Sequence, residues 1–170
     1  MIIAETNRLF ISKFTLKDAS FFLQLVNSPN WIKYIGDRET KTIKEAEERI
    51  KTGHLKSYKT NGFGFYKLLL KAENKNPIGT CGLIKRDTLD DVDIGFAMLP
   101  NYEGIGLAYE ASIEVIKLAN DEFHLNKLVA ITNPNNKKSI KLIEKLGLAF
   151  EKKTKPFEDD EELLLFAKTL

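Results

Sequence analysis

A glycine-containing turn between residues 92 and 111 is the segment of this sequence best suited to chemistry. It reads Val92-Asp-Ile-Gly-Phe-Ala-Met-Leu-Pro-Asn-Tyr-Glu-Gly-Ile-Gly-Leu-Ala-Tyr-Glu-Ala111. A strand-like run ends at Pro100, glycines follow at positions 104 and 106, and a helical pattern begins at once. Amide N–H groups at a helix N-terminus bind anions well when glycine leaves them uncrowded. We therefore expect Gly104 and Gly106 to hold a phosphate group.

Two known phosphate motifs do not fit this turn. A dinucleotide-binding Gly-x-Gly-x-x-Gly would need a third glycine at position 109, where the chain has Tyr109. A Walker loop needs Gly-Lys-Ser/Thr, and the chain contains no such sequence. The loop by itself also leaves open an ordinary strand-to-helix turn, in which the glycines serve only the backbone geometry.

Two further features lie close to this turn. In the strand before it, Asp93, Gly95 and Ala97 alternate with apolar residues, which suggests that one side of the strand packs in the core and the other lines a cleft. Later, Thr132-Asn-Pro-Asn-Asn-Lys-Lys-Ser139 follows another strand-like run and opens a helix, with Asn136 three residues before Ser139. We expect this helix to lie beside the first.

The elements that position these residues alternate between strand and helix periodicity, which predicts a mixed α/β (α+β) domain. Strands are expected over residues 8–14, 64–71, 78–85, 91–99, 127–132, 150–155 and 162–168. Helices are expected over residues 16–28, 42–50, 104–123 and 139–146. The predicted order is therefore β-α-α-β-β-β-α-β-α-β-β, in a single domain spanning residues 1–170.

Composition and charge exclude several classes of protein. The chain has 170 residues, 43% of them apolar, which supplies a core and argues against disorder. The 26 basic and 24 acidic residues give a net charge of +2, so no general attraction to nucleic acid or acidic membranes is expected. One cysteine allows no internal disulfide, and we expect no metal site. No apolar run approaches the roughly 18 residues of a spanning helix, and a cytoplasmic location is the expectation.

Several of these motifs together resemble the GNAT acetyltransferase superfamily. They are Pro100–Ala111, Asn136–Ser139 and Glu144–Gly147. More narrowly, the chain resembles the branch that contains the ribosomal-protein N-terminal acetyltransferases (RimJ/RimL-like). The segments that fit this branch are Glu5–Leu9, Asp18–Ala19, Trp31–Ile35 and Pro77–Gly82. The resemblance covers nearly the whole chain in order. It implies a mixed, mostly antiparallel central sheet flanked by helices, with acetyl-CoA in a V-shaped gap between the fourth and fifth predicted strands.

The resemblance implies a set of cofactor-binding residues. The amides that would hold the CoA pyrophosphate belong to Glu103, Gly104, Ile105, Gly106, Leu107 and Ala108. Met98 and Leu99 would pair with the pantetheine arm, and an amide there would stabilise the oxyanion. The Glu103 side chain should point away from the phosphates. Asn136 would bond the pantetheine arm, with Ser139 near the sulfur.

The resemblance also suggests catalytic residues. Asp93 is the best candidate for the general base, acting through a water, although it could instead be a surface acid at a strand end. Asp91 and Glu103 are weaker candidates. Many superfamily members have a tyrosine that protonates the sulfur where this chain has Ile143. Ser139 is then the candidate acid or thiolate-stabilising donor, unless it only caps its helix.

The implied activity is acetyl transfer from acetyl-CoA to a primary amine, by direct attack in a ternary complex. The acceptor could be a small molecule or the α-amino group of a peptide or protein, and an acyl group other than acetyl stays open. A non-catalytic module that binds acyl-CoA is the alternative hypothesis. Trp31 and the acidic run Glu158–Glu162 could border the acceptor, or could serve only as packing and as a solvated turn. The sequence leaves monomer and homodimer equally open.

Overall fold

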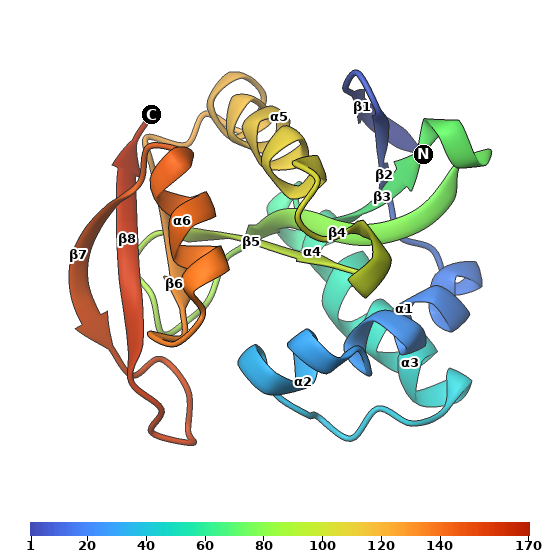
Figure 1. The fold of residues 1–170 in the computed structure, drawn as a ribbon, viewed down its shortest axis with the longest axis horizontal. Coiled ribbons are helices and arrows are strands. Elements are labelled where there is room, and N and C mark those ends of the chain that lie inside the picture. The colour runs from blue at the N-terminus through green and yellow to red at the C-terminus, as the bar shows by residue number, and fades with distance from the viewer.

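The computed structural model describes residues 1–170 as one eight-stranded sheet with helices on both faces (Figure 1). The strand order is β1-β2-β3-β4-β5-β6-β8-β7, and every neighbouring pair is antiparallel except β5 and β6. The strands are β1 Ile2–Glu5, β2 Leu9–Lys13, β3 Phe65–Leu70, β4 Asn76–Ile84, β5 Val92–Met98, β6 Lys127–Thr132, β7 Ala149–Thr154 and β8 Leu163–Thr169. The predicted mixed, mostly antiparallel sheet is thus confirmed.

Helices pack against both faces of the sheet. The α-helices are α1 Ala19–Val26, α2 Pro29–Tyr34, α3 Ile43–Arg49, α4 Lys56–Asn61, α5 Leu107–Asp121 and α6 Lys137–Lys145. The 3-10 turns are η1 Leu16–Asp18, η3 Lys71–Glu73 and η4 Pro100–Tyr102, and a π-helical turn, η2 Ile50–Leu55, joins α3 to α4. Apolar residues of α5 and α6 share one core with the sheet, whereas those of α1 and α3 form a second core on the opposite face. No helix is long and apolar enough to cross a membrane.

The alternation predicted for β5 is confirmed. Val92, Ile94 and Met98 are buried in the core that contains the apolar residues of α5. Ala97 packs instead against the core formed by α1 and α3. The two faces of β5 therefore meet different layers of the molecule, as its two-residue period requires.

Three elements differ from the expectation. The strand β1 was not predicted, because its four residues are too few to show a clear period. The helix α2, which begins at Pro29 directly after the helix predicted over residues 16–28, was not predicted. Proline is well tolerated at the first helical position, since that position needs no amide donor. The helix predicted over residues 42–50 continues through η2 and α4 to Asn61.

Local capping patterns account for several helix ends. Thr42 and Glu45 form a capping box at the start of the helix predicted over residues 42–50: the Glu45 amide donates to Thr42 Oγ1 (3.2 Å) and the Thr42 amide donates to Glu45 Oε2 (2.9 Å). After α6, Gly147 adopts a left-handed φ of 88°, as expected for the residue that follows a helix.

Candidate active site

A gap opens between β5 and β6. The two strands run parallel, and they pair only at Val92 with Leu128 and at Asp93 with Val129. Both strands then continue, β5 to Met98 and β6 to Thr132, without further pairing. One edge of β5 is therefore left without a partner strand over its last five residues, and its peptide groups are available to another extended chain.

Met98 and Phe96, rather than Leu99, present their peptide groups to this gap. The Leu99 amide donates to the Ile78 carbonyl of β4 (2.8 Å), and the Leu99 carbonyl accepts from the Tyr102 amide (3.0 Å). Both backbone groups of Leu99 are thus occupied, and its predicted pairing with the pantetheine arm is not available. Because peptide groups alternate in direction along a strand, those of Met98 and Phe96 point away from β4 and toward β6. Phe96 was not among the residues predicted to face the gap, although the alternating direction of peptide groups along the strand could have identified it.

The turn after β5 holds a row of unsatisfied amides. Gly104 and Gly106 have left-handed φ angles of 73° and 83°, and Gly106 is the N-cap of α5. From Gly104 to Tyr109, no amide donates a hydrogen bond to any backbone or side-chain acceptor of the protein. The set includes Ile105, Leu107 and Ala108. Six successive free donors at the positive end of a helix of 15 residues make an anion-binding cradle.

Glu103 takes a different place from the other residues predicted for the cradle. Its amide donates to the Pro100 carbonyl (3.3 Å) and so is not free. Its carboxylate accepts two hydrogen bonds from Asn30 Nδ2 in α2, at 2.9 and 3.0 Å. The side chain is held toward α2 by this contact. This contact also joins the cradle to the first helices of the chain.

At the other side of the gap, α6 begins with Asn136 and Ser139. Asn136 Oδ1 accepts from the Ser139 amide (3.2 Å), so Asn136 caps the helix. Only the Nδ2 group of Asn136 is left to donate to a ligand. The Ser139 hydroxyl is half-buried and makes no hydrogen bond within the protein, so it is not needed as a cap. It is a free donor near the start of α6.

The comparisons with known proteins match this geometry. The family model described as the acetyltransferase (GNAT) domain matches residues 8–149. The chain belongs to the GNAT acetyltransferase family. N-acetyltransferase p20 of Bacillus licheniformis is 28% identical to it over 154 residues, which cover 90% of this chain and 85% of that protein. This GNAT protein is therefore an acyltransferase.

Solved structures share the complete fold. The ribosomal-protein-S5-alanine acetyltransferase of Vibrio fischeri has a TM-score of 0.81 at 20% identity, over 98% of this chain and 95% of that one. The spermidine N-acetyltransferase of Vibrio cholerae, in complex with CoA and spermine, gives 0.78 at 18% identity over 95% of each chain. The microcin C7 self-immunity acetyltransferase MccE, in complex with acetyl-CoA and AMP, gives 0.80 at 17% identity over 96% and 93%. These likenesses establish the GNAT fold.

Asp93 lies at the closed end of the gap, but it is not exposed to a cleft. It is 2% exposed, and its Oδ2 accepts from Arg86 Nε at 2.9 Å. Burial raises the pKa of Asp93 to about 6, and the neighbouring Arg86 limits the rise. Arg86 in turn lies over the ring of Phe157, 5.2 Å from its centroid. The alternative of a surface acid is therefore wrong, and any contact between Asp93 and a substrate must be indirect.

The two segments expected to border an acceptor are the β7–β8 loop, which carries Glu158–Glu162, and the helix α2, which carries Trp31. The β7–β8 loop is tied to the turn after β6 by Asn133 Nδ2, which donates to Glu161 Oε1 (2.6 Å). In α2, Trp31 packs against the core of α1 and α3, which supports its interpretation as a packing residue. Neither contact indicates which amine the protein accepts.

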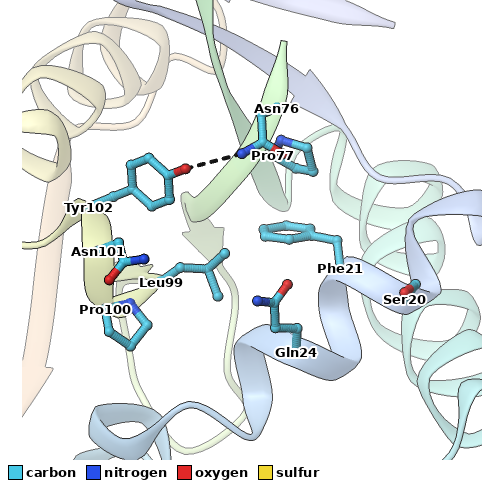
Figure 2. A pocket seen from close by; sticks show the side chains of 9 residues that line it. All are labelled: Ser20, Phe21, Gln24, Asn76, Pro77, Leu99, Pro100, Asn101 and Tyr102. Atoms are coloured by element: carbon cyan, nitrogen blue, oxygen red, sulfur yellow. Dashed lines mark hydrogen bonds between the residues drawn. The ribbon is translucent and has the colours of Figure 1, made fainter. Parts of the chain in front are cut away.

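A separate cavity of about 570 Å³ lies on the α1 side of the same turn. Figure 2 shows it between Phe21 and Gln24 of α1 and the Leu99–Tyr102 segment. Tyr102 Oη donates to Glu73 Oε2 (2.6 Å) and accepts from Asn76 Nδ2 (3.2 Å) at one edge. Of the predicted site residues only Leu99 lines this cavity, so it is distinct from the gap.

Cys81 plays no part in the gap. It is fully buried, and burial raises the pKa of its thiol to about 12. Cys81 therefore serves as a small buried residue of the core. No group of three or more His, Cys, Asp or Glu side chains is arranged to hold a metal ion.

Proposed function

We propose that this GNAT acetyltransferase moves the acetyl group of acetyl-CoA to a primary amine by direct attack in a ternary complex. The row of free amides from Gly104 to Tyr109, at the open end of the β5–β6 gap, carries the proposal. Six amides without protein acceptors at the N-terminus of α5 are suited to the pyrophosphate of CoA. The gap then accommodates the extended pantetheine arm, which pairs with the free edge of β5 at Met98 and Phe96.

The backbone of β5 contributes to the reaction itself. The acceptor amine attacks the thioester carbonyl carbon, the carbon–nitrogen bond forms, and the carbon–sulfur bond breaks. An amide of β5 that faces the gap, at Met98 or Phe96, stabilises the negative charge on the carbonyl oxygen. Holding both substrates in one gap supplies much of the acceleration, because attack becomes effectively unimolecular.

Two proton transfers complete the reaction. The acceptor's ammonium first loses a proton, and we assign this proton to Asp93 through water, because its carboxylate is 2% exposed and out of direct reach. With a pKa of about 6 the carboxylate is mostly ionised at neutral pH and can accept the proton. The departing thiolate accepts a hydrogen bond from the uncommitted hydroxyl of Ser139 at the start of α6, and takes through water the second proton, which the nitrogen loses as the amide forms.

For the acceptor we propose an α-amino group of a protein or a small-molecule amine, in keeping with the RimJ/RimL-like branch. The ribosomal-protein-S5-alanine acetyltransferase and the spermidine N-acetyltransferase show by their names that one fold serves both classes. We place the reaction in the cytoplasm, in keeping with the single, buried cysteine.

A thiol-release assay tests the proposal. The protein is incubated with acetyl-CoA and pools of peptides with free N-termini or of polyamines, and free CoA is measured against the rate without acceptor. We expect release with at least one pool, together with an acetylated product detected by mass spectrometry. Binding of CoA without turnover on any pool would favour the non-catalytic acyl-CoA-binding module. Absence of CoA binding would reject both.

A further inference from the structure

Arg8 stands beside the amide cradle although it is almost one hundred residues away in sequence. It lies in the turn between β1 and β2, and its Nη1 donates to the Ile105 carbonyl at 2.9 Å. A β-carbon at Gly106 would lie 3.3 Å from Arg8 Nη2. Two positive charges contact cradle residues: this guanidinium, and Lys145, whose Nζ lies 4.1 Å from the centroid of the Tyr109 ring. Of the two, only Arg8 hydrogen-bonds to the backbone of the cradle.

Glu110 fixes the orientation of this guanidinium. The Arg8 Nε group donates to Glu110 Oε2 (2.7 Å), and the Arg8 amide and the Thr6 hydroxyl both donate to Oε1, at 2.7 and 2.6 Å. Burial opposes ionisation of Glu110, but these hydrogen bonds outweigh it and hold the pKa of the carboxyl below its usual value. These hydrogen bonds therefore join the first turn of α5 to the β1–β2 turn, and they restrict the orientation of the Arg8 side chain.

These contacts leave part of the guanidinium unused. An arginine side chain has five N–H donors in a rigid fork. In Arg8, the Nε group donates to Glu110 and the Nη1 group donates to the Ile105 carbonyl, whereas Nη2 has no partner in the protein. The side chain is 41% exposed, so it is not enclosed by the protein. A pre-oriented, partly used guanidinium next to free backbone amides is suited to a phosphate oxygen.

We propose that Arg8 is a ligand of the CoA phosphates, donating from Nη2 to an oxygen of the group held by the Gly104–Tyr109 amides. This proposal deepens the proposed function and rests on it. Glu110 and Thr6 are then positioning residues, which act on the cofactor only through Arg8. The N-terminal hairpin thereby becomes part of the cofactor site.

The test compares binding of CoA with binding of pantetheine, which lacks the phosphates, by calorimetry with the full chain. We expect Arg8→Gln to weaken CoA binding by about 10- to 100-fold, which corresponds to one lost charge-assisted hydrogen bond of about 1.5–3 kcal/mol. The affinity of the variant for pantetheine should stay within about twofold of the wild-type value, because pantetheine lacks the phosphates that Arg8 would contact. The dependence of CoA affinity on salt should also become shallower in this variant.

Lys71→Gln is the matched control. Lys71 belongs to the same end of the sheet and pairs with Glu5 Oε1 (2.5 Å) and the Thr6 carbonyl (2.6 Å), without touching the cradle. The Lys71→Gln substitution also removes one positive charge, and it should leave CoA affinity unchanged. If Arg8→Gln does not fold, Arg8→Lys serves, because lysine cannot bridge Glu110 and the loop while reaching a phosphate. Arg8→Lys should also weaken the binding of CoA and leave the binding of pantetheine unchanged.

Two results would overturn the proposal. One is a CoA affinity of the folded Arg8 variant equal to that of the wild type. The other is an equal loss for CoA and pantetheine, which would mean that Arg8 only supports the local fold. Failure of the proposed function is recognised separately, because the wild-type protein would then bind no CoA. Wild-type CoA binding without acetyl transfer would leave the role of Arg8 intact.

Discussion

Asp93 should make the protein more stable in mild acid, against the usual trend for carboxylates. Its pKa is about 6 in the folded protein and 3.8 in the unfolded chain, a difference of about two units. The folded state therefore binds the proton more tightly than the unfolded state between these values. The resulting stabilisation is fully present below pH 3.8 and is lost as the pH rises through about 6. At 1.36 kcal/mol per unit, the total is about 3 kcal/mol.

Urea unfolding of the wild type and of Asp93→Asn, between about pH 4 and about pH 7.5, isolates this contribution. The other carboxylates cancel in the difference between the two proteins. We expect the free energy of unfolding of the wild type, relative to Asp93→Asn, to fall by about 2.5 kcal/mol over this range, most of the total, because pH 4 already lies slightly above the pKa of the unfolded chain. A flat difference curve, or one that rises with pH, would refute the account of Asp93 as a buried carboxylate.

Asp37→Asn provides the contrasting control. Asp37 is exposed and accepts from the Glu39 amide (2.8 Å) and from Lys41 Nζ (3.2 Å). The hydrogen bond from the Glu39 amide, followed by the contact with Lys41, lowers its pKa. Its contribution to stability is present at neutral pH and is lost as the pH falls. The difference curve for Asp37→Asn should therefore slope in the opposite direction to that for Asp93→Asn.

Three further substitutions test the cradle, the sheet and the start of α6, and a fourth, Gly53→Ala, is a control. Gly106→Val should abolish measurable CoA binding, since a left-handed non-glycine residue costs about 1–2 kcal/mol and the new side chain meets Arg8; undiminished affinity by calorimetry would reject the cradle. Gly82→Ala should destabilise the fold by about 1–3 kcal/mol in thermal melts, because its β-carbon would overlap the Gly64 carbonyl oxygen. Gly53→Ala should instead stabilise the fold by about 0.5–1 kcal/mol, because Gly53 lies on a helix and its β-carbon would meet no other atom. Ser139→Ala should lower kcat about tenfold, with the KM for acetyl-CoA unchanged, if one hydrogen bond to the sulfur is lost; an unchanged kcat would exclude that role.

The sequence by itself determined the features that depend on neighbours along the chain. The two faces of β5, the capping box at Thr42 and Glu45, and the left-handed Gly147 all follow from local periodicity and local hydrogen bonds. The glycines of the cradle were recognisable for the same reason, because a strand followed by Gly-x-Gly and a helix exposes amides wherever it occurs. Local signals failed for β1 and α2, because elements of four and six residues are too short to show a clear period.

Only the tertiary structure decided how these pieces form a site. The parting of β5 and β6 depends on the order of strands in the sheet, and this order frees the backbone of Phe96 and Met98 while occupying that of Leu99. The burial of Asp93 depends on Arg86, whose direction the sequence does not reveal. Arg8 reaches the cradle only because the β1–β2 turn packs on α5. Such contacts join residues distant along the chain, and no local pattern encodes them.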